Sequence, residues 1–188
     1  MEDENKVKKI IKIVIITIIV LIVILIGFFI YRNIQIKTNT NKLYEYVKKE
    51  GYQKNENNYY TKDTKTENQT ITEIIGAKEY PFAQKTITST NDKYINIFLT
   101  YESNNIVTIK YKSEEYNEEN KIVTINQQGT LKNNNFKCEV ISNNDLNTRC
   151  NTMKKEAEKY YQKINNILKE NKINLKYVKT NAKKQTRF

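Results

Sequence analysis

Histidine and tryptophan are both absent from this chain of 188 residues. Without an imidazole there is no Ser-His-Asp or Cys-His catalysis, no His-ligated zinc and no histidine-based pH switch. Glycine occurs four times and never in a cluster, which excludes glycine-rich phosphate-binding loops. We therefore expect no catalytic, cofactor-binding or metal-binding residues, and a protein that is not an enzyme. An enzyme with this composition would have to work with Asp, Glu, Lys or Tyr alone.

Arginine is also scarce, although the chain is strongly basic. The net charge is +11, and all but three of the 32 basic residues are lysine. A positive field attracts anionic polymers, anionic lipid or nucleic acid. Lysine is a hydrated point charge that lacks the planar fork with which arginine reads phosphate, so nucleic acid is the least favoured of these partners. An alternative explanation of the positive charge is AT-rich coding, which enriches lysine, asparagine, isoleucine and tyrosine. The lysines would then only keep the surface soluble.

One long apolar run stands near the N-terminus. Residues 13–31 carry no charge, and Lys12 and Arg32 bracket them. A helix of this length spans about 28 Å, close to the hydrocarbon thickness of a bilayer. The run is apolar on all sides, unlike a core helix with a polar stripe, and it is longer than the apolar region of a signal peptide and lacks a small-residue cleavage site. We expect an uncleaved anchor that contacts the lipid bilayer through residues 13–31.

Basic residues flank this run unevenly, with four lysines before it and Arg32, Lys37 and Lys42 after it. The positive-inside rule then predicts a single-pass protein of the cell membrane, with a cytoplasmic N-terminus and the C-terminal domain outside. The expected parts are a basic tail at 1–12, the transmembrane helix at 13–31, a juxtamembrane helix at 32–52, an extracytoplasmic domain at 53–178 and a disordered basic tail at 179–188.

Alternation of apolar and polar residues dominates the middle of the chain, where Asn, Ser and Gly separate the runs, and this pattern is typical of an antiparallel meander. The expected strands are 58–62, 70–75, 85–89, 93–102, 105–112, 120–126 and 136–141, with turns at 103–104, 116–119 and 127–129. Apolar residues then recur at helical spacing over 145–171, and 173–178 resembles a last short strand. The fold class is therefore α+β: an N-terminal transmembrane helix, then a meander sheet packed against a long amphipathic C-terminal helix.

Two cysteines, Cys138 and Cys150, fall on the apolar faces of the last long strand and of the C-terminal helix. If that helix packs on the sheet, the thiols could meet and form a disulfide, which would require an oxidising compartment. The alternative is two separate buried thiols that act as small hydrophobes. A redox-active pair or a zinc site is disfavoured, because the spacing is not CxxC and two ligands without histidine cannot close a tetrahedral site.

Tyrosine and glutamate form the remaining clusters. The doublets Tyr59–Tyr60 and Tyr160–Tyr161 could stack on sugars or bases, but tyrosine also replaces the missing tryptophan as a large core residue, and we favour this second role. The acidic segment 114–119 lacks the spaced ligands of a calcium loop, so we expect a solvated turn.

The function indicated is a membrane-anchored extracytoplasmic domain that binds a protein or an anionic envelope polymer. A first alternative is a structural subunit of a multi-protein membrane complex. The outline of an anchor followed by a small α+β domain is similar to that of subunits of bacterial secretion and conjugation systems, without a shared motif. A second alternative is a basic nucleic-acid-binding domain.

Overall fold

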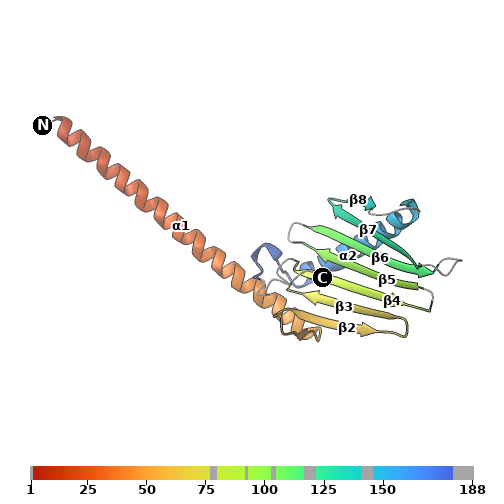
Figure 1. The fold of residues 1–188 in the computed structure, drawn as a ribbon. Coiled ribbons are helices and arrows are strands. Elements are labelled where there is room, and N and C mark those ends of the chain that lie inside the picture. Colours follow the sequence, from red (N-terminus) through yellow and green to blue (C-terminus); the bar gives the residue numbers. More distant parts are fainter. Residues whose placement is uncertain are drawn as a thin grey trace.

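The computed structural model describes residues 2–76, 80–91, 93–102, 105–116, 122–140 and 146–179. A long N-terminal helix leads into an antiparallel sheet, and a second helix follows the sheet, which confirms the expected α+β class (Figure 1). The elements are α1 (Glu2–Lys49), β1 (Gln53–Lys54), β2 (Tyr60–Lys65), β3 (Gln69–Ile75), β4 (Phe82–Ser89), β5 (Lys93–Tyr101), β6 (Ile106–Tyr116), β7 (Ile122–Lys132), β8 (Asn135–Val140), α2 (Leu146–Glu170) and the 3-10 helix η1 (Leu175–Tyr177).

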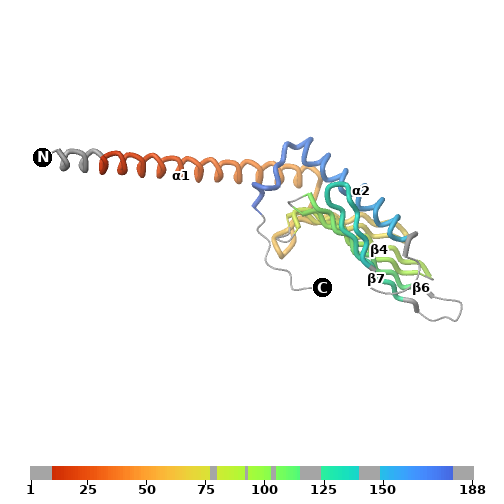
Figure 2. Tube along the Cα trace, turned by 90° about the horizontal axis from the view of Figure 1, so that it is seen from above, coloured from red at the N-terminus to blue at the C-terminus, as the bar shows by residue number. Residues whose placement is uncertain are grey.

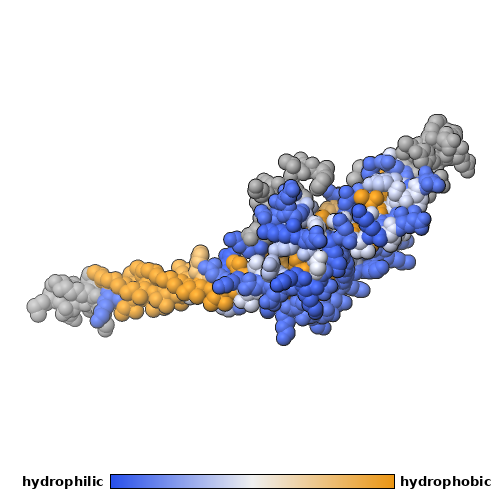
Figure 3. Space-filling view, turned by 90° about the horizontal axis from the view of Figure 1, so that it is seen from below, coloured by the Kyte–Doolittle hydropathy of each residue, from blue (hydrophilic) through white to orange (hydrophobic). Residues whose placement is uncertain are grey.

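Helix α1 is one unbroken element of 48 residues and projects far beyond the domain. Its first half is long and apolar enough to cross a membrane, and the most apolar stretch is not buried against any part of the structure. Figure 3 shows this apolar surface beside the mostly hydrophilic domain. The expected anchor and juxtamembrane helix therefore form a single helix, without a loop between them.

The C-terminal part of α1 is bound to the domain. Leu43 and Val47 lie in the hydrophobic core, with 6% and 1% of their surface exposed. Asn39 is also buried, and its Oδ1 accepts a hydrogen bond of 2.6 Å from the backbone N–H of Asn174. The Lys42 ammonium donates to the carbonyl of Lys172, and the backbone N–H of Lys179 donates to Thr40 Oγ1. The segment that follows α2 thus holds α1 against the sheet.

The sheet has eight strands in the order β1 to β8, and each strand pairs antiparallel with its sequence neighbours. This meander was expected, but one of its turns was placed wrongly. Residues 127–129 were predicted as a turn and instead lie inside β7. The chain turns at Asn133 and Asn134, whose φ angles of 50° and 62° suit asparagine in a tight hairpin. The expected turn at 103–104 lies outside the described residues, and so does the expected turn at 116–119 apart from Tyr116, which is the last residue of β6.

Gly129 lies inside β7 because there is no room for a side chain there. A Cβ at this position would overlap the ring of Phe136 on β8 and come within 3.2 Å of Ile109 Cγ2 on β6. The glycine therefore lets the Phe136 ring lie over the neighbouring strand. It is a packing residue, which explains why a glycine here does not mark a turn.

Helix α2 covers one face of the sheet, and the core lies between them (Figure 2). On α2, Met153, Ala157, Tyr160 and Ile164 are buried at helical spacing. Beneath them the sheet contributes Ile75, Phe82, Leu99, Tyr101, Val107, Ile109 and Leu131. After α2 the chain forms η1 where a strand was predicted at 173–178, because Leu175 is buried against the core and Asn174 caps the turn through its side chain. Of the expected basic tail, only Lys179 is among the described residues.

Replacing Gly129 by valine should destabilise the domain by roughly 1–3 kcal/mol, because the new side chain must displace Phe136 or Ile109 from a close-packed core. Urea unfolding of the full chain in detergent, followed by near-ultraviolet circular dichroism, measures this change. Thr130→Val on the same strand, whose side chain faces away from α2, is the matched control. Equal midpoints for both variants would contradict this role of Gly129.

Candidate functional site

The two cysteines lie together where β8 meets the start of α2. The Cα atoms of Cys138 and Cys150 are 5.9 Å apart, and their sulfur atoms are at bonding distance. Neither residue is fully buried, and Cys138 packs at the margin of the core. The placement fits the predicted disulfide, which would tie the first turn of α2 to the last strand. The pair holds structure together, and we assign it no further chemistry.

The face of the sheet opposite α2 carries no helix within the described chain (Figure 2). The strand register places one row of side chains on this open face across seven strands: Asp63, Thr72, Lys85, Phe98, Lys110, Gln128 and Glu139. Asp63 Oδ1 accepts a hydrogen bond of 2.7 Å from Thr72 Oγ1 at one end of the row. The two lysines therefore flank Phe98 directly, while both carboxylates of the row lie three strands from it.

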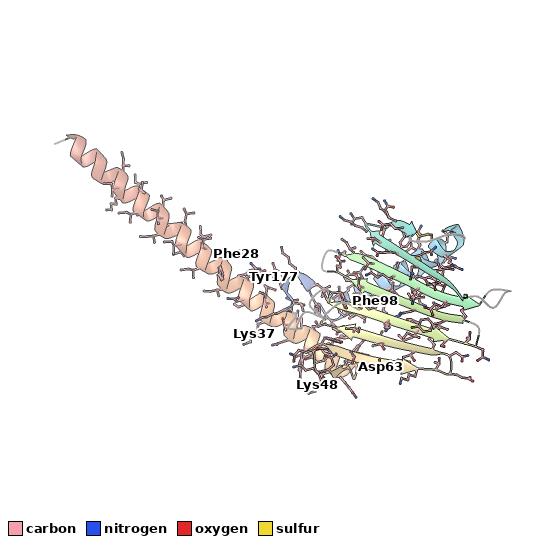
Figure 4. The ribbon with its side chains drawn as sticks, viewed as in Figure 1. Phe28, Lys37, Lys48, Asp63, Phe98 and Tyr177 are labelled. Atoms are coloured by element: carbon pink, nitrogen blue, oxygen red, sulfur yellow. A yellow bond between two sulfur atoms is a disulfide. The ribbon has the colours of Figure 1, made fainter. Side chains whose placement is uncertain are left out.

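Phe98 lies near the middle of this open face (Figure 4). Its neighbours in register are Lys85 on β4 and Lys110 on β6. Neighbouring strands are about 4.8 Å apart, so the Cα atoms of the two lysines, two strands apart, lie roughly 10 Å from each other. Among the described residues neither lysine makes an ion pair, whereas Lys112 nearby is paired with Glu114 at 2.6 Å. The site thus presents two unpaired ammonium groups on either side of an aromatic ring.

Tyr80 extends the aromatic surface from the connection before β4. Its ring meets the Phe98 ring edge-on, with centroids 5.6 Å apart and planes at 78°. Tyr80 and Ile74 pack in turn on the buried Tyr59, which forms a small apolar cluster separate from the main core. Of the first tyrosine doublet, Tyr59 therefore supports the open face, and Tyr60 packs against the core on the side of α2. An aromatic pair on a polar sheet face offers a platform on which a sugar ring or a base can stack.

A second polar cluster lies on the other face, between α1 and α2. Glu73 on β3 forms an ion pair with Lys163 of α2, and it accepts a hydrogen bond of 2.9 Å from Tyr52 Oη. The Tyr46 ring of α1 lies 6.2 Å from that of Tyr52, and Lys163 also donates to Gln84 Oε1 at 3.3 Å. Each group has a partner within the domain. This network joins four elements, α1, β3, β4 and α2, and its role is structural.

Burial raises the pKa of several tyrosines in and around this core. The pKa of Tyr101 rises to about 12, first through desolvation and then through the nearby Tyr161, whose ring stacks on it at 5.9 Å. Desolvation is also the main cause of the raised pKa of Tyr46, Tyr52, Tyr60 and Tyr160. A tyrosine in this state stays neutral at ordinary pH, so it serves as a hydrogen-bonding core residue and is a poor general base. Tyr160 and Tyr161 thus have the structural role that was favoured for them.

Acidic side chains of the described residues form no group of three or more that could hold a metal ion. Most of the acidic segment 114–119 lies outside the described side chains. Lys12 and Arg32 lie on α1, where they bracket the apolar stretch as expected.

The sequence contained a signal for the Phe98 site that was not used. In β5 the alternation places Ile95, Ile97, Leu99 and Tyr101 on the core face, so Phe98 must point the other way. A phenylalanine on the polar face of an alternating strand marks aromatic surface outside the core, and Phe98 is half-buried there. Its lysine neighbours could not be identified, because they depend on the pairing register of β4 and β6.

Comparison of the chain with protein-family models, with curated proteins and with solved structures found no match.

Raising the pH above 10 should destabilise the domain. A tyrosine whose pKa is about 10 in the unfolded chain and about 12 in the folded one favours folding fully below pH 10, and this contribution is lost as the pH rises toward 12. For Tyr101 the loss is roughly 1–3 kcal/mol. Unfolding free energies between pH 8 and 12, with tyrosinate absorbance recorded in parallel, test this. The unfolding free energy of Tyr101→Phe should decline less steeply with pH than that of the wild type. Identical slopes would contradict the role of Tyr101 in this pH dependence.

Proposed function

We propose that this chain is a membrane-anchored, non-enzymatic protein whose domain stands outside the cell membrane and binds an anionic glycopolymer on the open face of its sheet. The observation that carries this proposal is Phe98 between the unpaired Lys85 and Lys110. Sugar rings stack on aromatic side chains, and lysines attract the phosphate or carboxylate groups that such polymers carry along their length. A broad, flat face with charge on both sides of a ring suits an extended chain better than a compact ligand.

The proposed location rests on two supports. The apolar part of α1 is exposed along its length and has the composition of a membrane-spanning helix. The placement of Cys138 and Cys150 at bonding distance favours an oxidising compartment, which is outside the cytoplasm. With the domain outside, nucleic acid is not the natural partner, and the basic groups of the open face are lysines.

Protease shaving of intact cells that carry a C-terminal tag should remove the tag, because the proposed orientation leaves the domain accessible. Reduction of the recovered chain should slow its migration in a denaturing gel, since the loop between Cys138 and Cys150 opens. Cys138→Ser/Cys150→Ser is the control that shows no such shift. A tag that is cleaved only after lysis would contradict the orientation, and a wild-type chain without a mobility shift would contradict the bond.

Lys85→Ala/Lys110→Ala should weaken binding of a purified polymer of phosphate-linked sugar rings about tenfold, since two attractive charges are worth roughly 1–2 kcal/mol together on an exposed surface. Phe98→Ala should weaken it to a similar extent through lost stacking. Isothermal titration of the full chain in detergent measures these affinities at low and at moderate salt. The affinity should be lower at moderate salt, because the added ions screen the lysine charges.

Lys155→Ala/Lys159→Ala is the matched control, because it removes the same charge from exposed positions on α2. It should leave the affinity nearly unchanged. Absence of saturable binding by the wild type, or an equal loss in the α2 control, would refute the proposed role of the open face.

A further inference from the structure

A pocket of about 260 Å³ lies between α1 and the sheet, and the open-face proposal does not use it. Its wall on α1 includes Thr40 and Tyr44, and its other walls include Lys54, Asn58 and Tyr60. Gly76, directly after β3, and Lys179, beyond η1, complete it. In Figure 1 the start of β2 and the end of β3 lie on the side of the sheet from which α1 arrives, so this pocket is on the side of the domain nearest the apolar part of the helix.

The chemistry of the lining favours an anion. The residues that line the pocket include two lysines and no carboxylate. Two phenols and one side-chain amide add neutral hydrogen-bond donors around the ammonium groups. The Tyr44 and Tyr60 rings meet edge-on with centroids 6.1 Å apart, and burial raises the pKa of Tyr60, which keeps its hydroxyl a donor.

Both lysines are available for a ligand. Within the described chain neither Lys54 nor Lys179 has an ion pair, and both are exposed. Lys179 is held in place through its backbone, whose N–H donates to Thr40 Oγ1 at 3.1 Å, so its side chain remains free to turn toward the pocket. The site is thus assembled from α1, the margin of the sheet and the segment that follows η1.

The position along α1 limits what can reach this pocket. Thr40 lies eight residues beyond Arg32, which is about 12 Å along a helix. The headgroup layer of a bilayer occupies roughly 5–7 Å of that distance. The pocket therefore lies near the outer edge of the headgroup layer, where its ligand is either the phosphate of a lipid headgroup or a soluble phosphate ester of similar size.

We infer that this pocket is a binding site for a phosphate ester with a small polyol, such as a glycerol-phosphate unit. A volume of 260 Å³ accommodates a group of that size. The two ammonium groups neutralise the phosphate, while the phenols and the amide bind the hydroxyls. This site is independent of the Phe98 surface, because the two share no residue.

The first experiment titrates sn-glycerol 1-phosphate, with glycerol as the uncharged control, into the full chain in detergent. Saturable binding of the phosphate alone is expected, and Lys54→Ala/Lys179→Ala should weaken it at least tenfold. Both positions are exposed, so the fold should survive, which far-ultraviolet circular dichroism checks. Slower reductive methylation of Lys54 and Lys179 in the presence of ligand gives a second readout on the wild type.

Lys85→Ala/Lys110→Ala separates this site from the open face, because it should leave glycerol-phosphate binding intact whatever happens to polymer binding. Lys155→Ala/Lys159→Ala controls for net charge. No saturable binding by the wild type, or an equal loss in either of these two variants, would overturn the inference.

Nanodiscs distinguish the two sources of the phosphate. If phosphatidylglycerol in the disc competes with glycerol phosphate and an uncharged glycolipid does not, the pocket takes a lipid headgroup. If neither lipid competes while glycerol phosphate still binds and protects both lysines, the pocket takes a soluble or polymer-borne phosphate ester. Both results support a phosphate site and differ only in its source.

Discussion

The insertion of Leu43 and Val47 into the hydrophobic core is the contact on which the rest of the structure depends. These residues belong to the same helix as the apolar stretch, so the element that would cross the membrane also completes the domain. Without them, the core between α2 and the sheet would be open at one side. The buried Asn39 and the Glu73 network then fix the angle at which the helix enters. The pocket beside Thr40 exists only because α1 lies in this place.

Local patterns in the sequence predicted most of the architecture. Period-two alternation in β5 and β6 and helical spacing in α2 are signals that each segment carries by itself, and the structure follows them. The errors arose where the outcome depends on a contact with a residue outside the segment itself. In the sequence alone, Gly129 indicates a turn. The ring of Phe136 packs over it in the structure, which explains a glycine inside a strand. The segment around Leu175 was predicted to be a strand. The backbone N–H of Asn174 instead donates a hydrogen bond to Asn39 of α1, so this backbone is not available to pair with a sheet.

The candidate site could be predicted only in part, for the same reason. Alternation alone places Phe98 on the polar face, whereas the approach of Lys85 and Lys110 requires the register of three strands. Tyr80 comes from a connection whose path no periodicity describes. The cysteines were easier, because each lies on a recognisable apolar face and the two elements are adjacent in the chain. The face on which a residue lies can thus be anticipated from the sequence, whereas its neighbours on that face depend on the strand register.

The absence of a loop between the apolar stretch and the domain has a geometric consequence. A domain on a flexible linker samples many heights and orientations above a bilayer, but α1 would hold this one at a constant distance from the bilayer and at a constant angle to the helix axis. Its ligands would then have to pass through one thin layer parallel to the membrane, and a polymer lying deeper or farther out would escape capture. Rotation of the helix about its own axis would turn the open face toward different directions around the membrane normal. Capture by such a domain would depend on the height of a ligand above the membrane as well as on its chemistry.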